Sequence, residues 1–177
     1  MKKHVRALIL ASAALLVATS FFGCGSHQSS SSAETSKSAS DLANEPDVTF
    51  KDLQGKDVTL ASYKGKVVLV NFWGTWCPPC RKEMPDIEAL YDQFKDRGLV
   101  VLAISQEDAA KVKPFIAQRG FTYPVLLDPG GTVNRLFVVE GIPKSFVYDR
   151  SGKLVAESID MCTRMQFLAM LAQAGLH

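Results

Sequence analysis

Histidine is almost absent from this sequence, and the only one in the region that should fold is its last residue. The chain has 177 residues, and its three histidines are His4, His27 and His177. Cysteine is also sparse, with Cys24, Cys77, Cys80 and Cys162 as its only examples. A structural zinc site needs four Cys or His ligands, and a single Cys-x-x-Cys pair supplies two of them. A metal site and a non-catalytic metallochaperone are therefore disfavoured, and we expect no metal and no other cofactor.

The chain also lacks a charge excess of either sign. Its formal net charge is +2, but Lys2, Lys3 and Arg6 lie in the first 23 residues, which contain no acid. The remainder is close to neutral, so nothing favours binding to nucleic acid. A composition of 47% hydrophobic and 21% charged residues fits one globular domain with appendages.

No apolar run is long enough for a typical membrane-spanning helix, which needs roughly 20 residues. The longest, residues 7–22, follows the basic start MKKHVR and has the pattern of an export signal. An uncleaved membrane anchor is the second choice.

The export signal ends at a cysteine. Phe21-Phe22-Gly23-Cys24 resembles a bacterial lipobox, although Phe21 replaces the usual leucine. We therefore predict a signal peptide over residues 1–23 and a lipidated Cys24 as the mature N-terminus. Cleavage by the ordinary signal peptidase, for instance after residues 18–20, is the alternative.

Serine dominates the next segment, with eight serines in residues 26–40 and no large apolar side chain. Such a segment cannot bury enough surface to offset its conformational entropy. We predict a flexible tether over residues 24–41 and a single folded domain over residues 42–177.

Hydrophobic periodicity in this domain predicts alternating strands and helices. Hairpins are expected over residues 48–60 and 146–156, buried strands over 67–72 and 99–104, and a short strand over 123–127. Helices are expected over 78–95, near 112–120, over 133–137 and over 163–174. This order predicts an α/β fold with a mixed central sheet flanked by helices.

Cys77 and Cys80 stand where a buried strand turns into a helix. Pro78 at the first helical position places Cys77 at the N-cap, and a spacing of three puts both sulfurs within disulfide reach. The helix N-terminus favours a thiolate at Cys77. That thiolate can attack a disulfide, and Cys80 can resolve the mixed disulfide. A structural staple is the alternative, but so short a loop removes little unfolded-state entropy.

Residues 72–85, FWGTWCPPCRKEMP, resemble the active site of the TlpA/ResA-like thiol–disulfide oxidoreductases of the thioredoxin superfamily. The resemblance runs from about Pro46 to Leu171 and includes Gly141-Ile142-Pro143. It implies a thioredoxin fold with an N-terminal β-hairpin and a central insertion. It also implies that Pro143 is a cis-proline facing the cysteines, so that Ile142, Pro143 and the rim residue Trp76 border the substrate groove.

The same resemblance suggests roles for several polar residues near the cysteines. Cytoplasmic thioredoxins carry a buried aspartate at the position of Asn71, which cannot accept a proton, and the resemblance implies that Glu83 replaces it as the nearby acid. A solvated helix carboxylate is the other interpretation of Glu83. Lys144 stands where relatives usually have threonine, so it either affects partner docking or faces solvent. Cys162 is expected to be a small buried hydrophobe.

The predicted protein is an extracytoplasmic thiol–disulfide oxidoreductase, tethered to a bacterial membrane on the periplasmic side if the cell is Gram-negative. We expect a monomer with Cys77 as nucleophile, Cys80 as resolving thiol and Glu83 as proton carrier. The resemblance implies disulfides of exported proteins as substrates, for example the CxxCH motif of apocytochrome c, and a membrane protein as electron donor. A disulfide-forming or isomerising enzyme is the main rival, and a peroxidase is disfavoured because it would not need the second cysteine.

Overall fold

The computed structural model describes residues 49–177. The predicted signal peptide, Cys24 and the serine tether lie outside the described residues, as does the start of the predicted domain at residue 42. Within residues 49–177, no helix combines the length and apolar character needed to cross a membrane.

A seven-stranded mixed sheet forms the centre of the domain, in the order β2-β1-β5-β4-β3-β6-β7. The central strand β3 (Val67–Trp73) is buried at every position, as its unbroken apolar run predicts. It pairs in parallel with β4 (Leu99–Ser105) and antiparallel with β6 (Lys144–Tyr148). The predicted mixed sheet is confirmed.

The outer strands come from the two predicted hairpins and one short strand. β1 (Thr49–Asp52) and β2 (Asp57–Thr59) form the N-terminal hairpin, and β6 continues into β7 (Leu154–Ser158). β5 (Val125–Leu127) joins β1 to β4. It begins two residues later than predicted, because Pro124 has no N–H to donate to a ladder.

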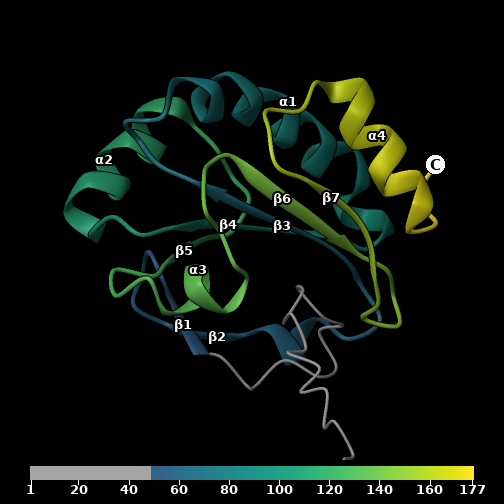
Figure 1. Cartoon of the computed structure of the whole chain (residues 1–177), viewed down its shortest axis with the longest axis horizontal. Helices are drawn as coiled ribbons and strands as arrows, with labels where there is room; N and C mark the ends of the chain where they lie inside the picture. The colour runs from purple at the N-terminus through teal and green to yellow at the C-terminus, as the bar shows by residue number, and fades with distance from the viewer. Residues whose placement is uncertain (1–48) are drawn as a thin grey trace, which may run out of the picture. The chain divides into compact units, whose positions relative to one another are not determined.

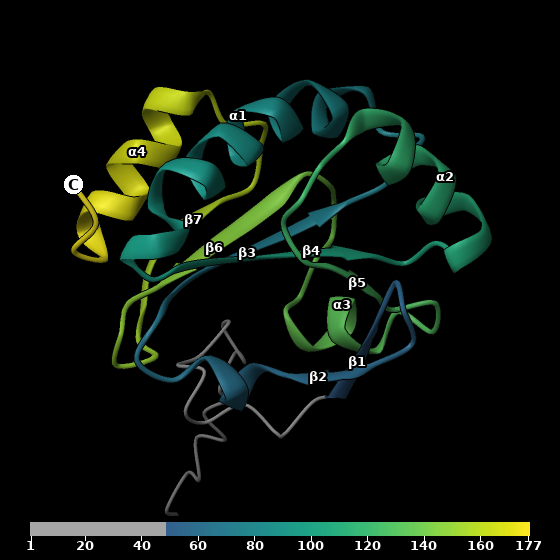
Figure 2. The ribbon, with the colours of Figure 1, turned by 180° about the vertical axis from the view of Figure 1, so that it is seen from behind.

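Helices cover both faces of the sheet (Figures 1 and 2). α1 (Pro78–Phe94) and α4 (Arg164–Gln173) lie side by side on one face, which α2 (Ala109–Arg119) also covers. The short α3 (Thr132–Leu136) and the 3-10 helix η1 (Leu60–Tyr63) cover the other face, and a second 3-10 helix, η2 (Lys95–Arg97), follows α1. The segment between β4 and β6 thus holds α2, β5 and α3.

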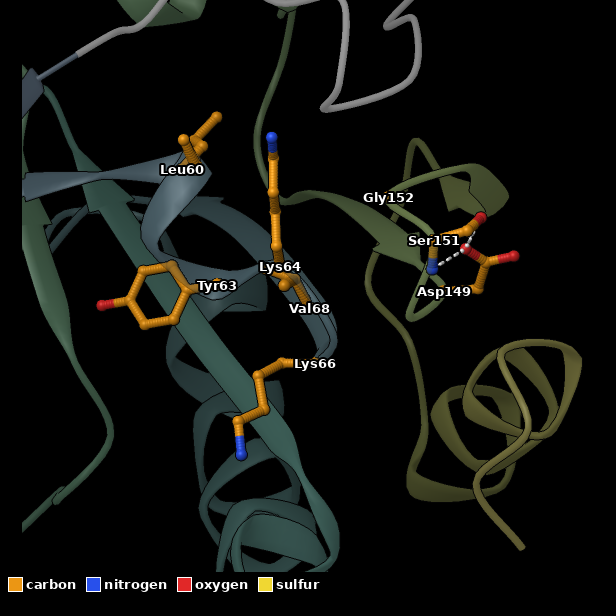
Figure 3. Close-up of a pocket in the computed structure, with 9 residues that line it drawn as sticks. Leu60, Tyr63, Lys64, Lys66, Val68, Asp149, Ser151 and Gly152 are labelled. Atoms are coloured by element: carbon orange, nitrogen blue, oxygen red, sulfur yellow. Dashed lines mark hydrogen bonds between the residues drawn. The ribbon is translucent and has the colours of Figure 1, made fainter.

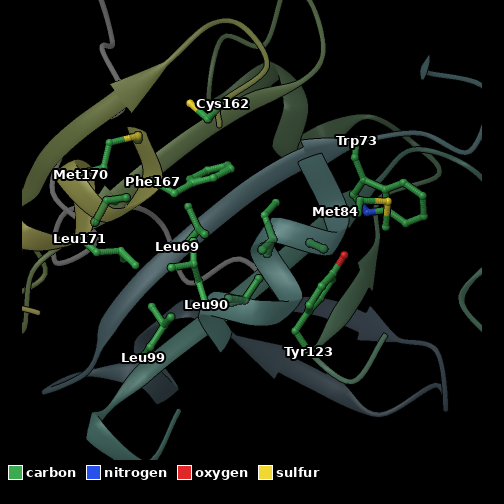
Figure 4. Close-up of a cluster of buried hydrophobic side chains, with 14 of the residues drawn as sticks. Leu69, Trp73, Met84, Leu90, Leu99, Tyr123, Cys162, Phe167, Met170 and Leu171 are labelled. Carbon is green, nitrogen blue, oxygen red and sulfur yellow. The ribbon is translucent and has the colours of Figure 1, made fainter. Parts of the chain in front are cut away.

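The core beneath α1 and α4 fixes the position of the cysteine-bearing helix. Four apolar residues of α1 face the sheet and are fully buried, as the predicted helical spacing requires: Met84, Ile87, Leu90 and Phe94. Figure 4 shows Leu90 of α1 and Phe167 and Leu171 of α4 gathered around Leu69 of β3. Burial of each such side chain stabilises the fold by about 2 kcal/mol, so the N-terminus of α1 sits on a rigid support.

Candidate active site

Cys77 and Cys80 form a disulfide at the start of α1. The sulfurs are bonded, and the two Cα atoms are 5.3 Å apart. Cys77 is the N-cap residue, Pro78 and Pro79 open the helix, and the Cys80 N–H donates to the Cys77 Sγ at 3.2 Å. The N-cap placement expected from the position of Pro78 is confirmed. In the reduced protein, this N–H and the helix N-terminus would stabilise a thiolate at Cys77.

The predicted cis-proline is also confirmed, since the Ile142–Pro143 peptide bond is cis. The carbonyl oxygen of Ile142 lies 3.8 Å from the Cys77 Sγ, so this loop borders the disulfide. Trp76 is 67% exposed, whereas Trp73 is buried in the core and Cys77 itself is only 2% exposed. The exposed Trp76 and the cis-proline loop thus flank the buried Cys77.

A small hollow of about 40 Å³ opens at this edge of the sheet. Its lining side chains are largely uncharged: Trp73, Trp76, Gln106, Glu107, Asn134 and Ile142. The exception, Glu107, receives hydrogen bonds from both the N–H and the hydroxyl of Thr75, at 2.6 and 2.8 Å. Glu107 thus fixes the turn that leads to Cys77, a contact that the sequence did not reveal.

Glu83 is buried one turn beyond Cys80 and is only 1% exposed. The interpretation of this residue as a solvated helix carboxylate is therefore wrong. Its spacing was an available signal, because Glu83 stands three residues after Cys80 and four before Ile87, on the buried face of the helix.

Each Glu83 oxygen has a hydrogen-bond donor. Asn71 Nδ2 donates to Oε1 at 2.8 Å, and the backbone N–H of Cys162 donates to Oε2 at 2.9 Å. The Asn71 amide also donates to the Ser145 hydroxyl at 3.0 Å. Burial raises the pKa of Glu83 to about 7, against the lowering effect of these two hydrogen bonds. The carboxyl group can therefore exchange a proton near neutral pH.

Cys162 is a free, buried cysteine, as predicted. Burial is the largest cause of the raised pKa of its thiol, and the charges of Glu83 and Asp160 act in the same direction. A protonated, enclosed thiol is a poor nucleophile. Cys162 therefore contributes its backbone N–H to the site rather than its sulfur.

Lys144 does not simply face solvent, which corrects that interpretation. It is half-buried, and its ammonium group donates to the carbonyl oxygen of Val138 at 3.2 Å. Among residues 49–177, no cluster of three or more His, Cys, Asp or Glu side chains could hold a metal ion.

Another hollow, of about 20 Å³, lies between η1 and the turn that joins β6 to β7 (Figure 3). One side is lined by Leu60, Tyr63 and Lys64. Another is lined by Asp149, whose carboxylate accepts a hydrogen bond from the Ser151 hydroxyl. A space of this size holds about one water molecule. None of its lining residues belongs to the cysteine site.

Residues 43–157 match the AhpC/TSA family. The chain belongs to this family. It is 40% identical over 113 residues to the thiol-disulfide oxidoreductase ResA of Bacillus thuringiensis, an alignment that covers 63% of this chain and 65% of that relative. The chain thus spans slightly less than two thirds of that protein. It is 34% identical to ResA of Geobacillus kaustophilus, with 87% of each chain covered.

Solved structures place the same domain in the thioredoxin superfamily. A thiol:disulfide interchange protein from Chlorobium tepidum is 32% identical, with a TM-score of 0.66 over 73% of this chain and 93% of that one. StoA from Bacillus subtilis is 26% identical, with a TM-score of 0.61 over 71% and 99%. The predicted thioredoxin fold is confirmed, and the Cys77–Cys80 pair identifies a thiol–disulfide oxidoreductase domain.

Proposed function

We propose that this protein is an extracytoplasmic thiol–disulfide oxidoreductase, tethered to a bacterial membrane through a lipidated Cys24, that reduces disulfides in exported proteins. The observation that carries the proposal is the arrangement of Cys77, Cys80 and Glu83 on one helix. Cys77 at the N-cap is the nucleophile, Cys80 one turn inside the helix is the resolving thiol, and the buried carboxyl group of Glu83 is the proton carrier.

The reaction is a dithiol–disulfide exchange that needs no cofactor. The Cys77 thiolate attacks one sulfur of the client disulfide, which breaks that bond and releases the other client sulfur as a thiolate. The Cys80 thiol loses its proton to Glu83, and its thiolate then attacks the Cys77 sulfur, which breaks the mixed disulfide and releases the second client sulfur as a thiolate. The enzyme ends as a disulfide and the client as a dithiol. Two electrons have moved to the client, and of its two protons one comes from Cys80 by way of Glu83 and the other from solvent.

The surroundings of the cysteines favour reduction over oxidation of the client. Strong oxidants of this superfamily stabilise their reduced form, through a highly stabilised thiolate. Here Pro78 and Pro79 separate the cysteines and carry no hydrogen-bond donor or charge. The Glu83 carboxylate opposes a second negative charge at Cys80. The reduced form of this protein should therefore be stabilised less than the reduced form of a strong oxidant.

The client and the electron donor follow from the resemblance to TlpA/ResA-like proteins. We propose that the CxxCH disulfide of apocytochrome c, which must be reduced before haem attaches, belongs to the client class. The proposed donor is a membrane protein that passes on electrons from cytoplasmic thioredoxin. A monomer held near the membrane by residues 24–41 could reach both.

The reduction potential of the purified protein tests the proposed direction. The protein is equilibrated in redox buffers of known potential, and its free thiols are then alkylated and counted by mass spectrometry. We expect a potential well below that of the strong oxidants, which lies at about −120 mV. A value near that limit would favour disulfide formation instead.

A further inference from the structure

Val138 has a backbone conformation that valine rarely adopts. Its φ is +50°, and it is the one non-glycine residue with positive φ among residues 49–177. A β-branched side chain in this left-handed region crowds the neighbouring backbone. Some nearby interaction must therefore hold Val138 in this state.

Val138 ends α3 in the position that usually belongs to glycine. Its N–H donates to the carbonyl oxygen of Arg135 at 3.2 Å, and the next N–H, of Val139, donates to that of Asn134 at 2.9 Å. These two bonds form a Schellman motif, in which the left-handed residue is most often glycine. The chain thus builds a glycine-type helix end with a residue that disfavours it.

The compensating contact comes from Lys144. Its ammonium group donates to the carbonyl oxygen of Val138 and lies 5.1 Å from the ring centroid of Phe146. The Ser145 hydroxyl accepts a hydrogen bond from Asn71, so strand alternation directs Lys144 and Phe146 to the opposite face of the sheet. There Phe146 packs against Phe137, with ring centroids 5.4 Å apart. The ammonium is thus fixed by a carbonyl and by an aromatic cluster.

The contact between residues 138 and 144 closes the loop that borders the disulfide. Within it stands Ile142, whose carbonyl oxygen lies 3.8 Å from the Cys77 Sγ. We propose that Lys144 is a positioning residue: it holds Val138 in the left-handed conformation and so fixes the cis-proline loop beside Cys77. Its charge is used within the protein and not as a docking point for the client. The kinetic consequence rests on the proposed function, whereas the structural one does not.

The test compares Lys144→Met, Val138→Gly and the double variant of the full chain, with Lys144→Arg as the control that keeps the charge and the donor. The first readout is hydrogen exchange of the Val139 amide, which reports on the Schellman motif. Lys144→Met should speed this exchange about tenfold. The double variant should restore slow exchange, because glycine adopts positive φ without help.

The second readout is kinetic. For a disulfide-bonded peptide, Lys144→Met should raise KM about fivefold, which corresponds to about 1 kcal/mol. The rate with glutathione disulfide, which needs less of the groove, should change by less than about twofold. Adding Val138→Gly should return KM to the wild-type value.

Two results would overturn the proposal. One is unchanged Val139 exchange in Lys144→Met, and the other is a raised KM that Val138→Gly does not rescue, since that would make Lys144 a direct client contact. A wild-type protein that reduces no disulfide would count against the proposed function alone, because the exchange comparison would still decide whether the Lys144 contact holds the loop.

Discussion

The carboxylate of Glu83 accepts a hydrogen bond from the backbone N–H of Cys162 at 2.9 Å, although 79 residues separate the two in the sequence. The bond ties α1, one turn beyond the redox cysteines, to the segment that precedes α4. Asn71 of β3 donates to the other carboxylate oxygen. Strand, helix and loop therefore meet on one buried acid, which is held at a fixed place beside Cys80.

A raised pKa at Glu83 makes stability depend on pH. The pKa rises from 4.5 to about 7 in the folded protein, so the folded state binds more protons than the unfolded state between these values. The free energy of unfolding should thus fall as pH rises from about 4.5 to 7, by at most about 3 kcal/mol. Glu83→Gln should remove this slope.

Urea denaturation of the oxidised protein at pH 5 and pH 8 measures this effect. The exposed Glu157→Gln on β7 is the matched control and should keep the wild-type slope. Parallel pH dependence in wild type and Glu83→Gln would contradict the prediction.

Glu83 should also affect the reactivity of the reduced cysteines. Its carboxylate opposes negative charge on the neighbouring sulfurs, so Glu83→Gln should shift the alkylation profile of Cys77 and Cys80 to lower pH. Iodoacetamide labelling of the reduced protein across pH 5–10, resolved by mass spectrometry for each cysteine, gives the profile. Superimposable profiles of the wild type and Glu83→Gln would contradict a role of Glu83 in proton transfer.

Local patterns were enough to predict most of the fold. The apolar run of β3, the spacing of buried residues in α1 and the proline after Cys77 each act over a few residues, and the structure confirms them. The cis bond before Pro143 was predicted from a family resemblance, because no local pattern distinguishes a cis bond from a trans bond.

The polar contacts of the site could not be predicted in this way. Glu83 meets Asn71 and Cys162 only after β3, α1 and the loop before α4 have packed. The hydrogen bond between Lys144 and Val138 depends on the left-handed residue that ends α3. Glycine usually occupies such a position, so a valine there gives no sign of this helix end in the sequence. Periodicity predicts which faces are buried, but it does not predict which buried polar groups become partners.

Two equivalent contacts allow the role of Glu107 to be isolated. Glu107 accepts two hydrogen bonds from Thr75, and Glu88 accepts two from Thr122, in each case from the backbone N–H and the hydroxyl. Glu107→Gln and Glu88→Gln should each cost about 1 kcal/mol of stability, because an amide accepts fewer hydrogen bonds.

Only the Glu107 contact holds the turn before Cys77, so only Glu107→Gln should slow reduction of a disulfide-bonded peptide, by about threefold. Thermal unfolding and peptide turnover, measured on both variants, test this difference. Equal turnover in the two variants would show that the Thr75 turn does not limit client binding.

The proposed membrane tether depends on residues outside the described structure. Because Cys24 ends a lipobox-like stretch, we expect the mature protein to begin at an acylated Cys24. Mass spectrometry of the membrane fraction should find this modified terminus, and Cys24→Ala should release the protein from the membrane. Recovery of an unmodified N-terminus at another residue would contradict lipid anchoring.

Trapping of the mixed disulfide tests both the chemistry and the client. Cys80 is the proposed resolving thiol, so Cys80→Ala leaves Cys77 able to attack a client but removes the thiol that resolves the product. In cells, this variant should accumulate covalent complexes that disappear on reduction, whereas Cys77→Ala should form none, because the N-cap position activates Cys77. The trapped proteins should include exported chains with a CxxC or CxxCH motif, such as apocytochrome c.

Cys162→Ala is the control for stray thiol chemistry and should leave the trapped set unchanged when added to Cys80→Ala, because the Cys162 thiol is enclosed. A reductase captures clients that were already oxidised, so growth in a reducing medium should diminish the complexes. Complexes that form only with reduced, newly exported chains would transfer the assignment to disulfide formation.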